Sequence, residues 1–246
     1  MDNEIRNALR QLARCNRHIH TDKSVCAARE MTVPAIIAAA ETAELECIVI
    51  TNHHHYPEHD ILADIAELKG QVENCRPSLQ VLVGAELSAL GSGTYVDTEE
   101  INRQVEFRLY ACNHYHADFW QQPEVRSPRG YAEHQLATLR QLLPSGRADC
   151  IAHPFHGLYL AAVFEDTSTV AAAFTDDELG DIMQLGRKND VAWEINVGSL
   201  LKDITFARRY LRIGMEIGAD FKVGTDAHHL INVDPKDAVE ELISRL

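Results

Sequence analysis

The sequence predicts a single-domain α/β fold built on a mostly parallel sheet. Short apolar runs alternate with segments of helical periodicity along the 246 residues, about seven times, and such alternation is typical of parallel α/β sheets. Histidines and carboxylates repeatedly follow the apolar runs, as expected where strand ends carry a functional site. Hydrophobic residues make up 46% of the chain, enough for a full core, and no repeat or Gly/Ser linker divides it.

The predicted strands are the apolar runs themselves. A strand that is buried on both faces reads as a continuous apolar segment rather than an alternating one. The first such run ends at the sequence Arg17-His18-Ile19-His20. The later runs are residues 47–53, 79–86, 107–114, 150–154, 191–196 and 221–228.

Helices are predicted between the strands from their apolar period and their capping residues. Thr32 is a candidate N-cap, Thr175 and Glu178 form a capping box, and Gly218 is a plausible stop. The segment 155–175 has no clear strand, and we expect either a lid over the site or a short helix there. The expected helices are residues 3–13 (within an N-terminal segment 1–14), 34–44, 61–68, 131–143, 179–185, 205–217 and 235–246.

Composition limits the partners. The net charge of −14 disfavours binding to nucleic acid or to an anionic membrane. A phosphorylated substrate stays compatible with it, because bound divalent cations reverse the local charge. No apolar stretch reaches the length of a membrane span, and residues 1–5 are too polar for a secretory signal. Six cysteines without a CxxC pair favour a reducing cytoplasm, with Cys47, Cys112 and Cys150 as core residues.

The His18-x-His20 pair is the first sign of a metal site. Side chains two residues apart on a strand share one face, so both imidazoles can reach one cation. Of the three adjacent histidines 53–55, His53 is nearest the strand end and is the predicted ligand. His54 and His55 are expected at the rim, where either is able to contact substrate.

Carboxylates at other strand ends complete the predicted ligand set. A lone glutamate such as Glu86 is usually a solvated loop residue, but beside histidines its two oxygens can bridge two cations. Asp226 and His228 are two residues apart, so both side chains can point to the same end of the predicted sheet. His114 is the preferred ligand of a second H-x-H pair, with His116 as a pocket residue, and His153 precedes a proline that fixes the strand end.

Taken in order, these motifs span nearly the whole chain, from about residue 17 to residue 228. They are His18-x-His20-Thr21, Thr51-Asn52-His53, Gly84-Ala85-Glu86, His114, Ala152-His153-Pro154, Glu194-Ile195-Asn196 and Gly224-Thr225-Asp226-Ala227-His228. The series resembles the PHP family, the polymerase and histidinol phosphatase-type metal-dependent phosphoesterases. The resemblance implies a distorted (β/α)7 TIM-like barrel with two or three divalent cations at the strand carboxyl ends.

The resemblance also implies how the ligands divide. His18, His20, Glu86 and Asp226 match the first metal position, Glu86, His114 and His153 the second, and His53 and His228 the third. Two residues depart from the family pattern near the third position. Cys26 stands where some members carry histidine, and Asn52 replaces the usual aspartate. We therefore expect the third position to bind its cation more weakly, with Cys26 a buried thiol rather than a ligand and Asp22 the other candidate.

The expected reaction is hydrolysis of a small phosphate ester by a metal-activated water. Glu86, Asp226 and His228 are the candidate catalytic residues, and a histidine-rich site takes zinc, manganese or iron. An amidohydrolase-type hydrolase is the rival enzyme, although no lysine ends a middle strand to act as a carbamylated bridge. A non-catalytic metal-binding module is the other alternative. Candidate substrate contacts are Lys23, His54, His116, Arg126, Arg129 and Glu194.

Overall fold

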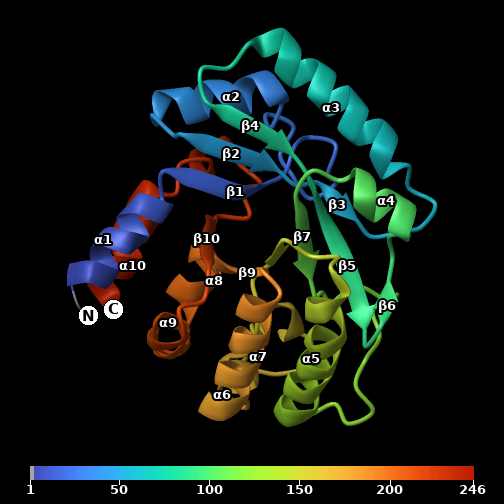
Figure 1. Ribbon diagram of the computed structural model, residues 1–246, viewed down its shortest axis with the longest axis vertical. Helices are drawn as coiled ribbons and strands as arrows, with labels where there is room; N and C mark the ends of the chain where they lie inside the picture. The colour runs from blue at the N-terminus through green and yellow to red at the C-terminus, as the bar shows by residue number, and fades with distance from the viewer. Residues whose placement is uncertain (1–2) are drawn as a thin grey trace.

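The strands of the computed structural model, which describes residues 3–246, form two parallel sheets (Figure 1). One has the order β1-β2-β4 and the other the order β10-β9-β8-β7-β5-β3, and the single antiparallel pair in these described residues joins β6 to β5. This confirms the mostly parallel α/β sheet that the alternation predicts. The strands are β1 (Cys15–Ile19), β2 (Cys47–Ile50), β3 (His53–His54), β4 (Gln80–Val83), β5 (Ala85–Gly91), β6 (Thr94–Tyr95), β7 (Arg108–Ala111), β8 (Cys150–Ile151), β9 (Ala192–Asn196) and β10 (Phe221–Gly224).

Two of the predicted runs each form two short strands, and this break connects the sheets. The chain leaves β2 and β4 in one sheet and continues as β3 and β5 in the other. Across the break, the Gly84 amide donates to the Ile50 carbonyl at 2.8 Å and the Glu86 amide to the Asn52 carbonyl at 3.0 Å. A side chain at position 84 would clash, since its Cβ would lie 2.2 Å from the carbonyl oxygen of Phe107.

The first strand also contacts the segment that follows the last one. The Ala227 amide donates to the His18 carbonyl, and the His20 amide donates to the Ala227 carbonyl, both at 3.0 Å. The carboxyl ends of β1 and β10 are thereby held next to each other, although the two elements are separated by most of the chain.

The helices cover the outer faces of the sheets, and those at the two termini lie side by side (Figure 1). Arg10 and Glu240 pair across this contact, with Nε and Oε1 2.5 Å apart. Residues 1 and 2 of the predicted N-terminal segment lie outside the described residues. The helices are α1 (Asn3–Leu12), α2 (Val33–Thr42), α3 (Ile61–Cys75), α4 (Glu99–Gln104), α5 (Pro128–Leu142), α6 (Ser168–Ala172), α7 (Asp176–Lys188), α8 (Val197–Lys202), α9 (Ile204–Ile217) and α10 (Lys236–Arg245).

The predicted capping residues are confirmed. The Thr32 side chain accepts from the third residue of α2, Thr175 and Glu178 form both bonds of the capping box on α7, and Gly218 ends α9 with φ +71°. The short helices α4 and α8 differ from the prediction, which has no helix at either place. The segment 155–175 contains α6 and a single 3-10 turn over Leu158–Leu160, so its helical alternative is present as two short pieces.

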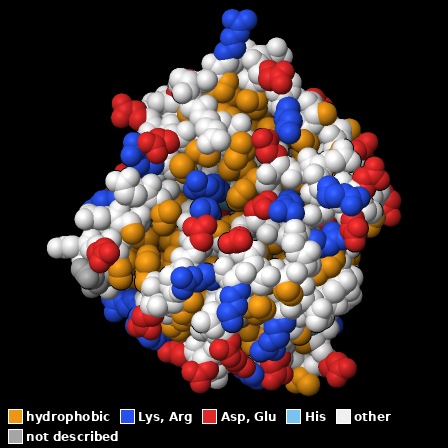
Figure 2. All heavy atoms as spheres, in the orientation of Figure 1, with side chains coloured by type: hydrophobic (Ala, Val, Ile, Leu, Met, Phe, Trp, Pro, Cys, Tyr) orange, Lys and Arg blue, Asp and Glu red, His pale blue; other side chains and the backbone are white. Residues whose placement is uncertain are grey.

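One continuous core lies between the sheets and the helices, with Trp193, Tyr110 and Tyr210 among its largest buried side chains. Cys47, Cys112 and Cys150 are buried, as predicted. Within residues 3–246, every helix is too short or too polar to cross a bilayer. On the face of the molecule drawn in Figure 2, Lys and Arg side chains are interspersed with Asp and Glu side chains and do not form a continuous basic surface.

Candidate metal centre

Glu86, the second residue of β5 and just past the break after β4, lies at the middle of a cluster of imidazoles. The register of β3 and β5 places it directly beside His53. Its Oε2 atom is 2.7 Å from His53 Nδ1 and 3.4 Å from His18 Nε2, while Oε1 is 3.0 Å from His153 Nε2 and 3.4 Å from His114 Nε2. The two oxygens of one buried carboxylate therefore face two different sets of nitrogen atoms.

Asp226 provides the second carboxylate of the cluster. Its Oδ1 atom lies 2.9 Å from His20 Nε2, 3.2 Å from His18 Nε2 and 3.6 Å from His228 Nδ1. The backbone has φ +53° at Asp226 and φ +28° at His153, and residues other than glycine seldom adopt positive φ values. Each such conformation costs roughly 1–3 kcal/mol and is concentrated at functional sites, because the surrounding structure must hold it in place.

The structure thus brings together all eight side chains that the sequence suggests as ligands. The donor atoms of each of three groups lie within 4.8 Å of one another. A fourth group, of His53, His55 and His114, includes a histidine that we expected only at the rim. The three groups that match the predicted sets in whole or in part are His18, His20 and Glu86; Glu86, His114 and His153; and His20, His53 and His228.

Unpaired buried atoms show that the cluster fits cations. Among the described residues, His18 Nε2, His53 Nδ1 and Glu86 Oε2 are buried and close to one another, yet none of them makes a contact with hydrogen-bond geometry. A buried polar atom in that state costs about 1–3 kcal/mol. A cation between these atoms would give each of them a partner, and this mixture of imidazole and carboxylate donors suits zinc, manganese and iron.

The charges of the cluster lead to the same conclusion. Burial raises the pKa of Glu86, yet the imidazoles of His53, His18 and His114 hold that pKa well below its ordinary value. Burial lowers the pKa of His53, but Glu86 and Cys26 outweigh burial and raise it to about 10. The buried carboxylate is therefore ionised and needs positive charge beside it, for which protons and metal ions compete.

Glu194 lies behind the cluster rather than in the cavity, where the sequence analysis expected a substrate contact. Its Oε1 is 2.8 Å from His18 Nδ1, and its Oε2 accepts from the backbone amide of His153 at 2.5 Å. Gly224 leaves room for this carboxylate, since a Cβ there would lie 2.0 Å from Oε1. Glu194 is thus placed to orient the His18 imidazole and to hold the backbone of His153, as carboxylates behind metal-binding histidines commonly do.

Asn113 has a similar place behind His153, and the sequence analysis missed it. Its Oδ1 lies 2.9 Å from His153 Nδ1, and its Nδ2 donates to the His153 carbonyl at 2.9 Å. The signal was a polar residue near the end of an apolar run, next to His114.

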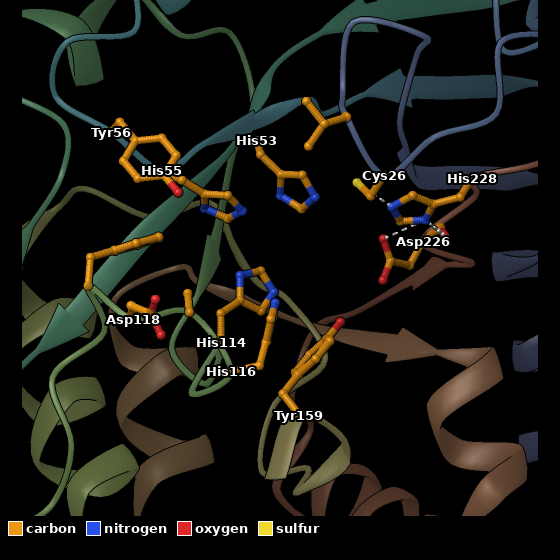
Figure 3. A pocket seen from close by; sticks show the side chains of 13 residues that line it. Cys26, His53, His55, Tyr56, His114, His116, Asp118, Tyr159, Asp226 and His228 are labelled. Atoms are coloured by element: carbon orange, nitrogen blue, oxygen red, sulfur yellow. Dashed lines mark hydrogen bonds and ion pairs between the residues drawn. The ribbon is translucent and has the colours of Figure 1, made fainter. Parts of the chain in front are cut away.

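A cavity of about 620 Å³ opens above the cluster (Figure 3). Aromatic side chains form much of its wall. The rings of Tyr56 and Phe119 are 4.9 Å apart, and that of Tyr159 lies 4.8 Å from the ring of His116. The lining residues are Val25, Cys26, His53, His55, Tyr56, His114, His116, Ala117, Asp118, Phe119, Tyr159, Asp226 and His228.

The predicted basic substrate contacts do not line this cavity. Lys23 Nζ lies 2.8 Å from Glu67 Oε2 on α3, and Arg126 is exposed to solvent. Arg129 is exposed and pairs with Glu178 at the start of α7. Acidic residues far away in the sequence bind Lys23 and Arg129, and strand-end patterns do not reveal such pairs.

The two remaining predicted contacts are histidines. His116 lines the cavity, as expected of a pocket residue. His54 does not: it is fully buried, and its ring packs 5.9 Å from that of His59 on the far side of β3 from the cavity lining. Its neighbours His53 and His55 face the cavity instead, because alternate side chains of an extended segment point in opposite directions.

The expectation that Cys26 is a buried thiol is wrong. Cys26 is exposed at the cavity, with its Sγ atom 3.0 Å from His228 Nε2. Burial raises the pKa of this thiol, but hydrogen bonds to His228 and His53 outweigh burial and lower the pKa to about 6. Asp22, the other candidate ligand, is exposed and does not line the cavity.

Comparisons with known proteins show a shared fold. No protein-family model matches the sequence, and no curated protein matches it significantly. The crystal structure of the "putative histidinol phosphatase hisK from Listeria monocytogenes" matches with a TM-score of 0.58 and 12% identity, over 89% of this chain and 96% of that one. The A. niger ochratoxinase matches with a TM-score of 0.49 and 10% identity, over 92% of this chain and 66% of that one. The likeness to the Listeria protein shows that this α/β fold occurs there too.

Proposed function

We propose that the chain is a metal-dependent phosphoesterase of the PHP type, which hydrolyses a small phosphate ester. The observation that carries this is Glu86, whose two oxygens face separate imidazoles, Oε1 those of His114 and His153 and Oε2 those of His18, His20 and His53. Such an arrangement is what a carboxylate that bridges two cations requires. We also propose that the strands close into a distorted (β/α)7 barrel, which the hydrogen bonds between Ala227 and the end of β1 support.

The cluster supplies the residues for this chemistry. His18, His20, Glu86 and Asp226 would hold one cation, and Glu86, His114 and His153 the other. Two divalent cations held by these residues would supply an activated water and would stabilise the charge on the phosphoryl oxygens. Glu194 and Asn113 fix the orientation of the imidazoles, while Tyr159 and His116 at the cavity wall are placed to contact the substrate beside them.

A second candidate is an amidohydrolase-type enzyme that cleaves a C–N or C–O bond. The cavity lining favours it in one respect, since within residues 3–246 no lysine or arginine lines the cavity. Enzymes that act on phosphate groups usually meet part of the charge with such side chains. The non-catalytic alternative is less favoured, because an open cavity of about 620 Å³ leaves room for a substrate beside the ligands.

A substrate panel distinguishes these candidates. We expect chromogenic phosphate esters to be hydrolysed, the activity to vanish with a chelator and to return with manganese or zinc. Carboxamides and carboxyl esters of the same chromophores are the matched control. The metal content must be measured on the same sample. Hydrolysis of the amides but not of the phosphates by metal-loaded protein would favour the second candidate instead.

The aromatic wall predicts a preference for aryl leaving groups. Tyr56→Ala and Phe119→Ala should each raise KM for an aryl phosphate about tenfold, equal to about 1.4 kcal/mol and within the range for stacking on an aromatic ring. Alkyl phosphates carry the same reacting group without a ring, so their KM should change little. Equal losses for aryl and alkyl substrates would show that the wall does not bind the leaving group.

A further inference from the structure

Cys26 lies beside the imidazoles of His228 and His53 at the edge of the cavity (Figure 3). We propose that it is a metal ligand, and that its thiolate completes a zinc site with His53 and His228, in which a water or the substrate fills the fourth position. This inference rests on the proposed metal centre but not on the reaction catalysed there. We therefore expect the third metal position to bind its cation tightly rather than weakly. Its thiolate ligand also distinguishes it from the two metal positions that share Glu86.

The distances fit such a site. The Sγ atom is 3.0 Å from His228 Nε2, and the thiol also interacts with His53. The donor atoms of His53 and His228 lie within 4.8 Å of each other, in a group that also includes His20. In a tetrahedral zinc site, Zn–S bonds of about 2.3 Å and Zn–N bonds of about 2.0–2.1 Å place the ligand atoms roughly 3.5 Å apart. Small side-chain movements would therefore bring the thiolate and the two imidazoles to one ion.

The loop that carries Cys26 is fastened on both sides. On one side, Asn52 Oδ1 accepts from the Thr21 amide at 2.8 Å and from the Ser24 hydroxyl at 3.1 Å. On the other side, the Ala28 amide donates to the carbonyl of His228 at 2.9 Å. Cys26 lies between these anchors, so its backbone is held relative to His228 before any ion binds.

Asn52 fastens this loop with both ends of its side-chain amide. While Oδ1 holds Thr21 and Ser24, its Nδ2 donates to Thr21 Oγ1 at 2.8 Å. The two departures from the family pattern therefore act together: the amide at position 52 fastens the loop, and the loop presents the thiol at position 26.

A thiolate changes which ion the position prefers. Imidazoles bring no negative charge, whereas a cysteine brings one and is a soft donor. Soft donors favour zinc over manganese, while the carboxylates around Glu86 and Asp226 accept either ion. We expect the native chain to hold zinc at the Cys26 position even when manganese fills the other two.

Cobalt titration of the full-length chain tests the proposal, because a thiolate bound to cobalt gives a near-ultraviolet charge-transfer band. The band should appear in the native chain and in Cys75→Ser, whose cysteine lies on α3 away from the cavity. It should be lost in Cys26→Ser, with a zinc affinity at this position about tenfold weaker or more. Asn52→Ala should weaken the band, since the side-chain bonds that hold Thr21 and Ser24 are lost.

Alkylation of the native chain provides a second measurement that needs no variant. Zinc should protect Cys26 from iodoacetamide, as read by peptide mass spectrometry, and leave the modification of Cys75 unchanged. A charge-transfer band that persists in Cys26→Ser, or its absence from native protein with three bound cobalt ions, would overturn the proposal. Full alkylation of Cys26 in zinc-loaded protein would do the same. None of these readouts depends on hydrolysis, so a failure here is separable from a failure of the proposed function.

Discussion

Glu86→Gln is expected to lower hydrolysis by about 10³-fold or more, the upper range for loss of one electrostatic group in an active site. The physical reason is that Glu86, among the described residues, reaches both sets of imidazoles, His18 with His20 and His114 with His153. Glutamine keeps one acceptor oxygen and loses the negative charge, so it cannot bridge two cations. The variant should also retain fewer metal ions per chain, as measured by elemental analysis after gel filtration.

Glu106→Gln is the matched control. Glu106 makes an exposed ion pair with Lys69. Its environment differs from that of Glu86, since 42% of its side chain is exposed, compared with 1% for Glu86. It should keep native activity and metal content. If the two variants lost activity equally, or if Glu86→Gln kept its metals and its rate, Glu86 would not be a bridging ligand.

Glu194→Gln is expected to weaken metal binding by about 10–100-fold, the usual effect of removing a partner that orients a ligand. The carboxylate of Glu194 accepts from both His18 and the His153 amide. Glutamine has one oxygen and can accept only one of these bonds, while its amide group faces the other donor. Glu194 is a positioning residue in this account, so excess metal should restore much of the lost hydrolysis. Metal titration, with the rate followed as a function of metal concentration, measures both effects.

Tyr210→Phe is the control for that variant. The Tyr210 hydroxyl donates to the backbone carbonyl of Glu194 at 3.0 Å, so the substitution disturbs the same strand and spares the carboxylate. Its metal affinity should stay native. A loss of activity in Glu194→Gln that no metal concentration restores would indicate that the substitution damages the fold rather than the orientation of the imidazoles.

The sequence predicted the parallel sheet because apolar runs alternate with helical segments along the chain. It predicted the long helices because their apolar residues recur with a helical period. Thr32, Thr175 and Gly218 also marked helix ends correctly. The short helices α4 and α8 were not predicted, since six residues are too few to show a helical period. The breaks after β2 and β4 were not predicted either, because each run was interpreted as one strand through Thr51 and Asn52 or through Gly84.

In the candidate site, the type of residue that follows each apolar run predicted the metal ligands. The direction in which each side chain points could not be predicted. The backbone at His153 and Asp226 turns into the left-handed region, which the sequence does not reveal. Side-chain partners were equally hidden. Glu194 turns inward to His18, and Cys26 reaches His228 because Asn52 fastens its loop.

Anomalous diffraction from crystals grown with manganese or zinc tests the central claim most directly. We expect two anomalous peaks about 3.5–4 Å apart, one on each side of the Glu86 carboxylate. His18 and Asp226 should lie at one peak, and His114 and His153 at the other. Crystals of folded protein at saturating metal that show no peak beside Glu86 would contradict it.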